Sequence, residues 1–257
     1  MGAQAMILGI GTGRSGSLSL ARLLNLQAGV FASHEFREIQ DGRQGKRLAE
    51  PLPWTSSLEI AEERLGLILD YPGDIVGDVS SSWLPYLAAL FEEGPSNLRV
   101  VCLRRAREAV VESFMRKTGK KHHWADHDGR RWLKDPRWDA TFPNLDPSLT
   151  KREAISRYWD EYRAEVDRLC RTHPERIRVW DMVEALGAGE QTRQMLEFAG
   201  VPPQDQVLSS IKANVAPAWW VSPDATPWRR TWGRAARMSI GLMRRLGPSR
   251  SAKGGRP

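Results

Sequence analysis

The 257-residue chain has few cysteines and no long apolar run. Its two cysteines, Cys102 and Cys170, fall in a segment with strand character and a segment with helix character, which argues against a disulfide framework. No apolar stretch is long enough to cross a bilayer, and an apolar strand begins by Met6, which leaves no room for a secretory signal. These absences predict a cytoplasmic protein, and the length permits a single α/β domain with a large core.

Acidic residues are absent from residue 228 onward, where nine lysines and arginines accumulate. Subtracting these nine charges from the formal net charge of +7 leaves −2 for residues 1–227. A nucleic-acid enzyme carries positive charge along its main groove, so we expect no nucleic-acid partner. We therefore predict a catalytic domain over residues 1–227 and a basic amphipathic tail over residues 228–257. The tail would form a helix on an anionic membrane surface, which would make the protein peripheral there, or a helix docked on the enzyme.

Residues 6–20, MILGIGTGRSGSLSL, join an apolar strand to a glycine loop and the start of a helix. Such a loop is suited to anions, because its glycines allow close approach of the backbone and the helix start presents unpaired N–H groups. Arg14 adds a cation to the loop, and Ser15 and Ser17 add hydroxyl donors. Ser17 also stands where the P-loop of nucleotide triphosphatases has its lysine, which argues against an ATPase or GTPase. The expected guest is a phosphate or sulfate ester.

The same glycines fit a second pattern, the dinucleotide fingerprint G-x-G-x-x-G, through Gly11, Gly13 and Gly16. Glu35 follows about 20 residues later, where that pattern places an acid for the ribose. An NAD(P)-dependent oxidoreductase is therefore an alternative function, although the chain offers no obvious Tyr-x-x-x-Lys pair for hydride transfer. A non-catalytic, membrane-associated nucleotide-binding protein is another alternative.

A second strand-to-helix junction supplies another arginine and another serine. The apolar residues 98–104 run into Arg105, and the helix that follows carries Ser113 on the same face. A guanidinium and a hydroxyl converging there suit a second phosphate group. With this pair, the chain resembles the sulfotransferases that use 3′-phosphoadenosine 5′-phosphosulfate (PAPS). In that family an [RK]-S-G-[ST] loop holds the 5′-phosphosulfate, and an arginine and a serine eight positions apart hold the 3′-phosphate.

The resemblance covers residues 6–20, which contain the Arg14-Ser15-Gly16-Ser17 match, and residues 74–114. It implies a PAPS-dependent sulfotransferase with a three-layer α/β fold, a mostly parallel sheet and a P-loop-like nucleotide site. The product would be 3′-phosphoadenosine 5′-phosphate (PAP), and no metal is expected. The implied cofactor-binding residues are Gly13, Arg14, Ser15, Gly16, Ser17, Leu18, Arg105 and Ser113.

The acceptor would be a hydroxyl or amine of a small molecule, a sugar or a lipid, and it needs a general base. Asp78 is the first candidate, because it is expected at the end of the strand before the Arg105 strand, where carboxyl ends face the crevice. His34 and Glu35, at the end of a neighbouring strand, are the alternatives. Arg14 is the candidate for stabilising charge on the transferred group.

Apolar periodicity predicts a βα alternation along most of the chain. Residues 37–56 and 117–147 break it, and we predict a loop for the first and a lid or insertion over the active face for the second. Three histidines in the second segment match no common zinc spacing. Thr150 and Glu153 predict a capping box that opens a long helix. The expected strands lie at 6–10, 30–32, 74–77, 98–104 and 176–180, and the expected helices at 15–27, 57–69, 83–92 and 190–199.

Overall fold

The computed structural model describes residues 4–40, 42–54, 57–116 and 149–211. The chain divides into two units, Met1–Asn214 and Val215–Pro257, and all described residues belong to the first. The lid predicted at 117–147 and the tail predicted at 228–257 lie outside the described residues. Both remain predictions, as does the boundary at residue 227.

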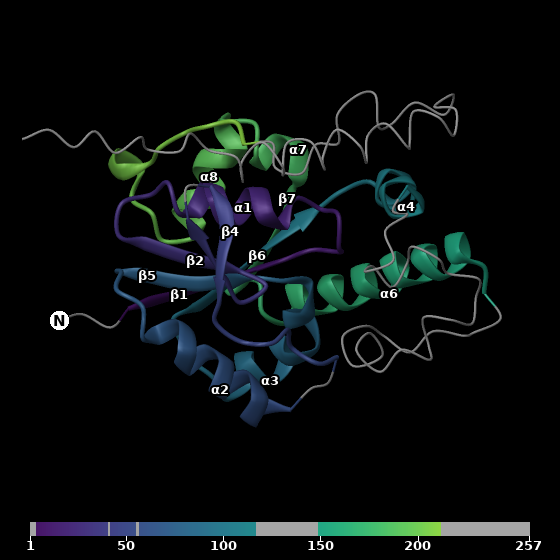
Figure 1. The fold of residues 1–257 in the computed structure, drawn as a ribbon, viewed down its shortest axis with the longest axis horizontal. Helices are drawn as coiled ribbons and strands as arrows, with labels where there is room; N and C mark the ends of the chain where they lie inside the picture. Colours follow the sequence, from purple (N-terminus) through teal and green to yellow (C-terminus); the bar gives the residue numbers. More distant parts are fainter. Residues whose placement is uncertain (1–3, 41, 55–56, 117–148, 212–257) are drawn as a thin grey trace, which may run out of the picture. The chain divides into compact units, whose positions relative to one another are not determined.

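A five-stranded, wholly parallel sheet forms the centre of the first unit (Figure 1). Its order is β2-β5-β1-β6-β7, so β1 is central and pairs with β5 on one side and with β6 on the other. The strands read as nearly continuous apolar runs because both faces of the sheet are covered. Their bounds are β1 (Ala5–Ile10), β2 (Val30–His34), β5 (Ile75–Val79), β6 (Leu98–Arg104) and β7 (Ile177–Asp181).

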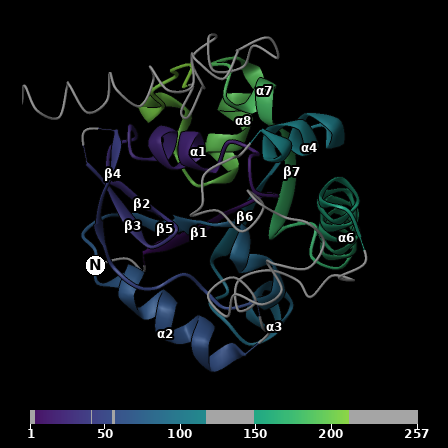
Figure 2. The same cartoon turned by 45° about the vertical axis from the view of Figure 1, so that its right-hand side comes forward.

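Helices pack on both faces of this sheet (Figures 1 and 2). On one face α1 (Ser17–Leu24), α7 (Met182–Ala185) and α8 (Glu190–Phe198) enclose an apolar core with the strands. On the other face the core is shared by α2 (Leu58–Leu69), the 3₁₀ helix η1 (Ser81–Tyr86), α3 (Leu87–Glu92), α4 (Arg107–Met115) and α6 (Lys151–Thr172). A short 3₁₀ helix, η3 (Pro203–Asp205), follows α8. The predicted three-layer α/β class is confirmed.

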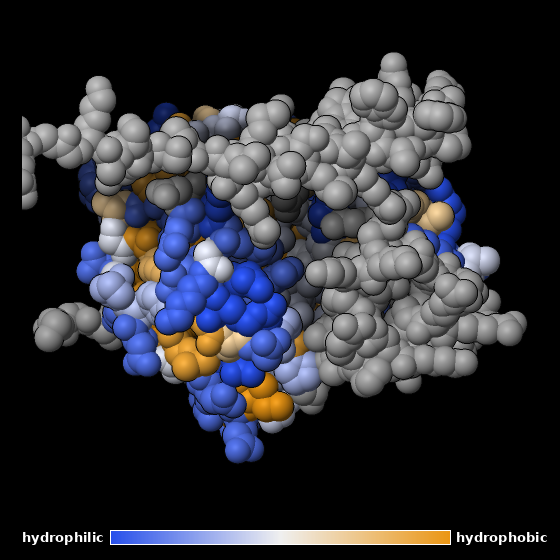
Figure 3. Space-filling model, in the orientation of Figure 1, coloured by the Kyte–Doolittle hydropathy of each residue, from blue (hydrophilic) through white to orange (hydrophobic). Residues whose placement is uncertain are grey.

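A β-hairpin occupies part of the segment that was predicted as a loop. Its strands, β3 (Arg37–Gln40) and β4 (Arg43–Arg47), pair antiparallel with Ile39 opposite Gln44. The loop prediction was wrong over residues 37–47, whereas the described residues 48–54 form no helix or strand. Both strands of the hairpin are polar, β3 is mostly half-buried and β4 is mostly exposed, so they lack the apolar alternation that predicts a strand. Hydrophilic residues dominate the surface over this hairpin (Figure 3).

Several local predictions can be compared directly with the structure. Thr150 and Glu153 form the reciprocal capping box at the start of α6, as predicted. Strand β5 extends to Val79, which places Asp78 inside the strand and not at its end. Cys102 and Cys170 are both free thiols. Among the described helices none is long and apolar enough to span a membrane.

Candidate functional site

The glycine loop connects the carboxyl end of the central strand β1 to α1. Arg14 and Gly16 have left-handed backbone angles, with φ of 71° and 89°, which turn the loop back toward the helix. The N–H of Ser15 donates to the carbonyl of Thr12, and their two hydroxyl oxygens lie 2.6 Å apart. Ser15 is 1% exposed, so its hydroxyl closes the loop and does not face outward.

The helix that follows the loop begins without a side-chain cap. Gly16 is the N-cap residue, and no acidic residue lies in the first turn of α1. The first N–H groups of a helix have no acceptor within the helix, and they carry its positive dipole end. Ser17 and Leu18 are the first two residues of α1, so their amides lie at this end. The start of α1 therefore has the uncapped, acid-free end on which the prediction of an anion site depends.

Two loop glycines are required by packing. A Cβ on Gly13 would meet the ring of Phe114 at 2.6 Å. A Cβ on Gly11 would meet the carbonyl oxygen of Leu103 at 2.6 Å, and Gly11 has φ of +155°. Because neither glycine has a Cβ, the loop can pack closely against β6 and α4, where the second predicted motif lies.

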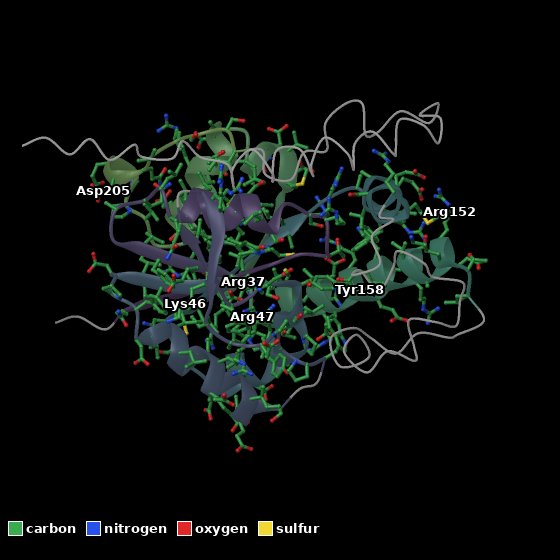
Figure 4. All side chains as sticks on the ribbon, viewed as in Figure 1. Arg37, Lys46, Arg47, Arg152, Tyr158 and Asp205 are labelled. Carbon is green, nitrogen blue, oxygen red and sulfur yellow. The ribbon has the colours of Figure 1, made fainter. Side chains whose placement is uncertain are left out.

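Two buried tyrosines on α6 hold the backbone of the loop. The N–H of Gly11 donates to the hydroxyl of Tyr162 at 3.1 Å, and the N–H of Gly13 donates to that of Tyr158 at 3.3 Å (Tyr158 is labelled in Figure 4). The Tyr162 hydroxyl donates in turn to the carbonyl of Ser81. Burial raises the pKa of Tyr158 to about 12 and that of Tyr162 as well, so both stay protonated at neutral pH. The sequence predicts the long helix that carries these tyrosines, but it gives no signal for their contacts with the loop.

The two predicted anion motifs meet through Arg14. Its Nε donates to the hydroxyl of Ser113 on α4 at 3.0 Å. Arg105, at the end of β6, donates from Nη1 to the carbonyl of Arg14 at 2.8 Å. The carbonyl of Arg105 is in turn fixed by the indole N–H of Trp159. Residues almost a hundred positions apart in sequence thus form one cluster, although Ser113 contacts Arg14 and not Arg105.

This cluster is rich in positive charge and poor in negative charge. Within the described part of the chain, no carboxylate forms an ion pair with Arg14 or Arg105. Burial lowers the pKa of Arg14, and the charge of Arg105 lowers it further. Burial and the charge of Arg116 lower the pKa of Arg105 in the same way. Each of these half-buried guanidinium groups is destabilised by burial and by a neighbouring positive charge, so a bound anion would stabilise both.

A small hollow of about 20 Å³ lies between the first residues of the loop, the end of β6 and α6. Gly11, Arg105, Trp159 and Arg163 are among its lining residues. Arg163 is paired with Asp167 at 2.7 Å, whereas Arg104 and Arg105, which also line the hollow, form no ion pair with the described carboxylates. The hollow therefore lies beside Arg105 and the first two loop residues, Gly11 and Thr12.

His34 lies against the start of α1, at the end of β2. Its Nε2 is 2.9 Å from the hydroxyl of Ser17, and its Nδ1 is within hydrogen-bonding distance of the side-chain amide nitrogen of Gln44 on β4. His34 is 5% exposed. Burial, together with the nearby charge of Arg22, lowers its pKa to about 4 against the opposing effect of Asp78. His34 is therefore neutral at physiological pH.

Asp78 is completely buried, and both of its carboxylate oxygens are occupied. Oδ1 accepts from the Ser33 hydroxyl at 2.6 Å and from the Phe36 N–H at 3.0 Å, while Oδ2 accepts from the Trp83 indole N–H at 2.8 Å. Burial raises the pKa of Asp78, and the three hydrogen bonds counter this rise. A carboxylate enclosed in this way is suited to holding the backbone, and an acceptor would reach it only after rearrangement.

The backbone that Asp78 holds is strained. Glu35 and Phe36 have φ of 51° and 53°, so two consecutive non-glycine residues are left-handed. Each such residue costs about 1–3 kcal/mol, and such strain is often found at functional sites. The N–H groups of Glu35 and Phe36 donate to the Val79 carbonyl and to Asp78, which stabilises the turn. The turn leaves Glu35 exposed immediately after His34.

The structure thus brings together most of the residues that the sequence singled out. Arg14, Ser113 and Arg105 form one cluster, and Ser17 and His34 form a second beside it. The Gly13 N–H donates to Tyr158, and the Leu18 side chain is buried in the core while its amide lies at the start of α1. Sequence patterns missed the roles of Gln44, Tyr158 and Tyr162. The only signal for the two tyrosines is that they are four residues apart, which places them on the same face of α6.

The sheet order bears on the dinucleotide alternative. In a dinucleotide-binding fold, the strand after the first crossover helix lies next to β1 and presents the ribose-binding acid. Here β5 lies between β1 and β2, so Glu35 at the end of β2 is two strands away from the loop strand, about 10 Å at the usual spacing. The geometry therefore disfavours a ribose contact from Glu35.

Metal-binding residues do not gather in the described part of the chain. No three histidine, cysteine, aspartate or glutamate side chains within it lie close enough together to hold an ion. The histidines at 122, 123 and 127 lie outside the described residues.

No known family model matches the chain, and no curated protein matches it. Among solved structures, the chain is similar to a crystal structure of a sulfotransferase from Alicyclobacillus acidocaldarius. The two share 14% identity with a TM-score of 0.49, over 95% of this chain and 97% of that chain.

Proposed function

We propose that this chain is a sulfotransferase that takes its sulfuryl group from PAPS. The observation that carries the proposal is the contact between Arg14, Ser113 and Arg105, which joins two anion-binding motifs from distant parts of the chain. PAPS has a charged group at each end of its ribose, and two separate cationic sites suit such a ligand. A nucleotide with a single charged end would use only one of them.

The described residues fit PAPS in charge and in donor type. Arg14, the Ser17 hydroxyl and the amides at the start of α1 would hold the 5′-phosphosulfate, whose oxygens need donors and positive charge. Arg105 and Ser113 would hold the 3′-phosphate. Arg14 would exchange its contact with Ser113 for a contact with the ligand, which frees the Ser113 hydroxyl for the second phosphate.

When bound, PAPS supplies a sulfuryl group on a phosphate leaving group. Arg14 and the helix amides would stabilise the charge that develops on the peripheral and leaving oxygens, as preorganised donors do in phosphoryl transfer. Tyr158 and Tyr162 keep the loop in place, so little reorganisation is needed during the reaction.

The acceptor must lose a proton, and we assign Glu35 as the general base in preference to Asp78. Glu35 is exposed on a strained turn beside His34, which contacts Ser17 of the loop. Asp78 is enclosed by three donors and holds that turn. We propose a hydroxyl or amine of a small molecule, a sugar or a lipid as the acceptor.

Calorimetry with PAP, adenosine 5′-phosphate (AMP) and NADH tests the proposal. PAP should bind at least about tenfold more tightly than AMP, since a hydrogen bond to a charged group contributes about 1.5–3 kcal/mol. NADH should bind more weakly than PAP. Equal affinity for PAP and AMP, or tighter binding of NADH, would overturn the assignment.

A further inference from the structure

The hydrogen bonds of His34 determine which of its nitrogens carries the proton. The side-chain nitrogen of Gln44 can only donate, and it faces Nδ1 of His34. Nδ1 must therefore accept, and in a neutral imidazole the proton then lies on Nε2. Nε2 faces the hydroxyl of Ser17 at 2.9 Å, so His34 donates to Ser17. With its oxygen accepting from His34, Ser17 is free to donate its own proton elsewhere.

Ser17 is the first residue of α1, at the end where an anion would bind. We propose that Gln44 is a positioning residue that acts through His34 to keep the Ser17 hydroxyl as a hydrogen-bond donor toward the bound anion. This inference rests on the proposed function for the identity of the anion, and it adds the β3–β4 hairpin to the binding machinery. It also gives His34 a positioning role, because Nε2 is protonated and cannot take a proton from an acceptor.

The surroundings of His34 are consistent with a single neutral tautomer. Arg22 on α1 and Asp78 on β5 are the charged groups that act on the ring, and Glu35 follows it in the chain. Burial keeps the pKa of His34 at about 4, so the imidazole carries one proton across the physiological range. A neutral imidazole can donate a hydrogen bond to only one of its two neighbours. Residue 44 therefore decides whether the proton lies on Nδ1 or on Nε2.

Gln44→Glu is the variant that reverses the arrangement. A carboxylate can only accept, so it would draw the imidazole proton to Nδ1, and Nε2 would then accept from Ser17. The Ser17 hydroxyl would be lost to the anion. Gln40→Glu is the matched control, because it makes the same change on the same hairpin at a side chain that contacts Glu38 and not His34.

Two measurements on the full-length protein test the proposal. Proton–nitrogen NMR of the imidazole groups, with His34 assigned by its loss in His34→Gln, should place the proton on Nε2 in the wild type and on Nδ1 in Gln44→Glu. Calorimetry with PAP should show about a tenfold or larger loss of affinity in Gln44→Glu and in Ser17→Ala, and little change in Gln40→Glu. Adding Gln44→Glu to Ser17→Ala should cause little further loss.

The outcomes separate this inference from the proposed function. An Nδ1 proton in the wild type overturns it, whatever the protein binds. Equal PAP affinity of Gln44→Glu and wild type overturns it as well. If Gln44→Glu lowers PAP affinity by the same factor in the wild type and in Ser17→Ala, the cause is simple charge repulsion, and the inference is overturned as well. If the wild type binds no PAP, the proposed function fails, and the NMR result and titration with inorganic sulfate decide the role of Gln44.

Discussion

Replacement of Arg105 by alanine should remove the preference for PAP over AMP. Arg105 ends β6, and its guanidinium donates to the carbonyl of Arg14 at 2.8 Å with no carboxylate partner among the described residues. Its contact with the 3′-phosphate would contribute about 1.5–3 kcal/mol, which corresponds to about 10- to 150-fold in Kd. Its hydrogen bond to the Arg14 carbonyl also has a charged donor and contributes about 1.5–3 kcal/mol, and its loss affects both nucleotides equally.

Arg105→Ala should therefore weaken PAP binding about 10- to 150-fold more than AMP binding, as measured by calorimetry at fixed ionic strength. Arg107→Ala is the matched control, because it removes a cation from the same junction but one whose guanidinium is held by Asp160. That variant should leave the ratio of the two affinities unchanged. A parallel loss for PAP and AMP in Arg105→Ala, or an equal change of ratio in Arg107→Ala, would refute the assignment of the 3′-phosphate site.

Three further predictions concern the base, the loop and the pH dependence. Glu35→Gln should abolish transfer from PAPS, measured by a product assay, while retaining PAP binding. Asp78→Asn should lower the thermal midpoint, since the new amide leaves one of the three donors unpaired, which costs about 1–3 kcal/mol. If Glu35→Gln still transfers the sulfuryl group, the base is Asp78 and not Glu35. Tyr162→Phe should leave the Gly11 N–H unpaired, which should lower the thermal midpoint by about 2–4 °C per kcal/mol of stability lost and weaken PAP binding. An unchanged thermal midpoint would contradict this role of Tyr162. His34 has a pKa of about 4 in the folded protein and about 6.5 in the unfolded chain, so between these pH values only the unfolded chain binds the proton. The free energy of unfolding should therefore decrease as the pH falls through this range, by at most about 1.4 kcal/mol per pH unit. Denaturant unfolding of His34→Gln should lack this component, and an identical pH slope in both proteins would contradict it.

The strand–loop–helix unit at residues 6–20 could be predicted because its signals are local. An apolar run, closely spaced glycines and the leucines of α1 lie within a few residues of one another, and the same holds for the capping box at Thr150. The strand at 98–104 was equally visible as an apolar run that ends in arginine. The hairpin was missed because its strands are polar, so burial imposes no pattern on them.

The contacts that assemble the site could not be predicted in the same way. Gly11 and its partner Tyr162 are 151 positions apart, and nothing in the periodicity of α6 distinguishes a core tyrosine from one that holds a loop amide. The strained turn at Glu35 and Phe36 has no glycine to mark it, because Asp78 stabilises it from another strand. The sequence pairs Arg105 with Ser113 by spacing alone, whereas the fold inserts Arg14 between them.

A structure of the PAP complex, determined by crystallography, tests the central claim most directly. The account predicts the 5′-phosphate at Arg14, Ser17 and the start of α1, and the 3′-phosphate within hydrogen-bonding distance of Arg105 and Ser113. PAP bound away from the loop, or bound at the loop with its 3′-phosphate pointing away from Arg105, would contradict the account.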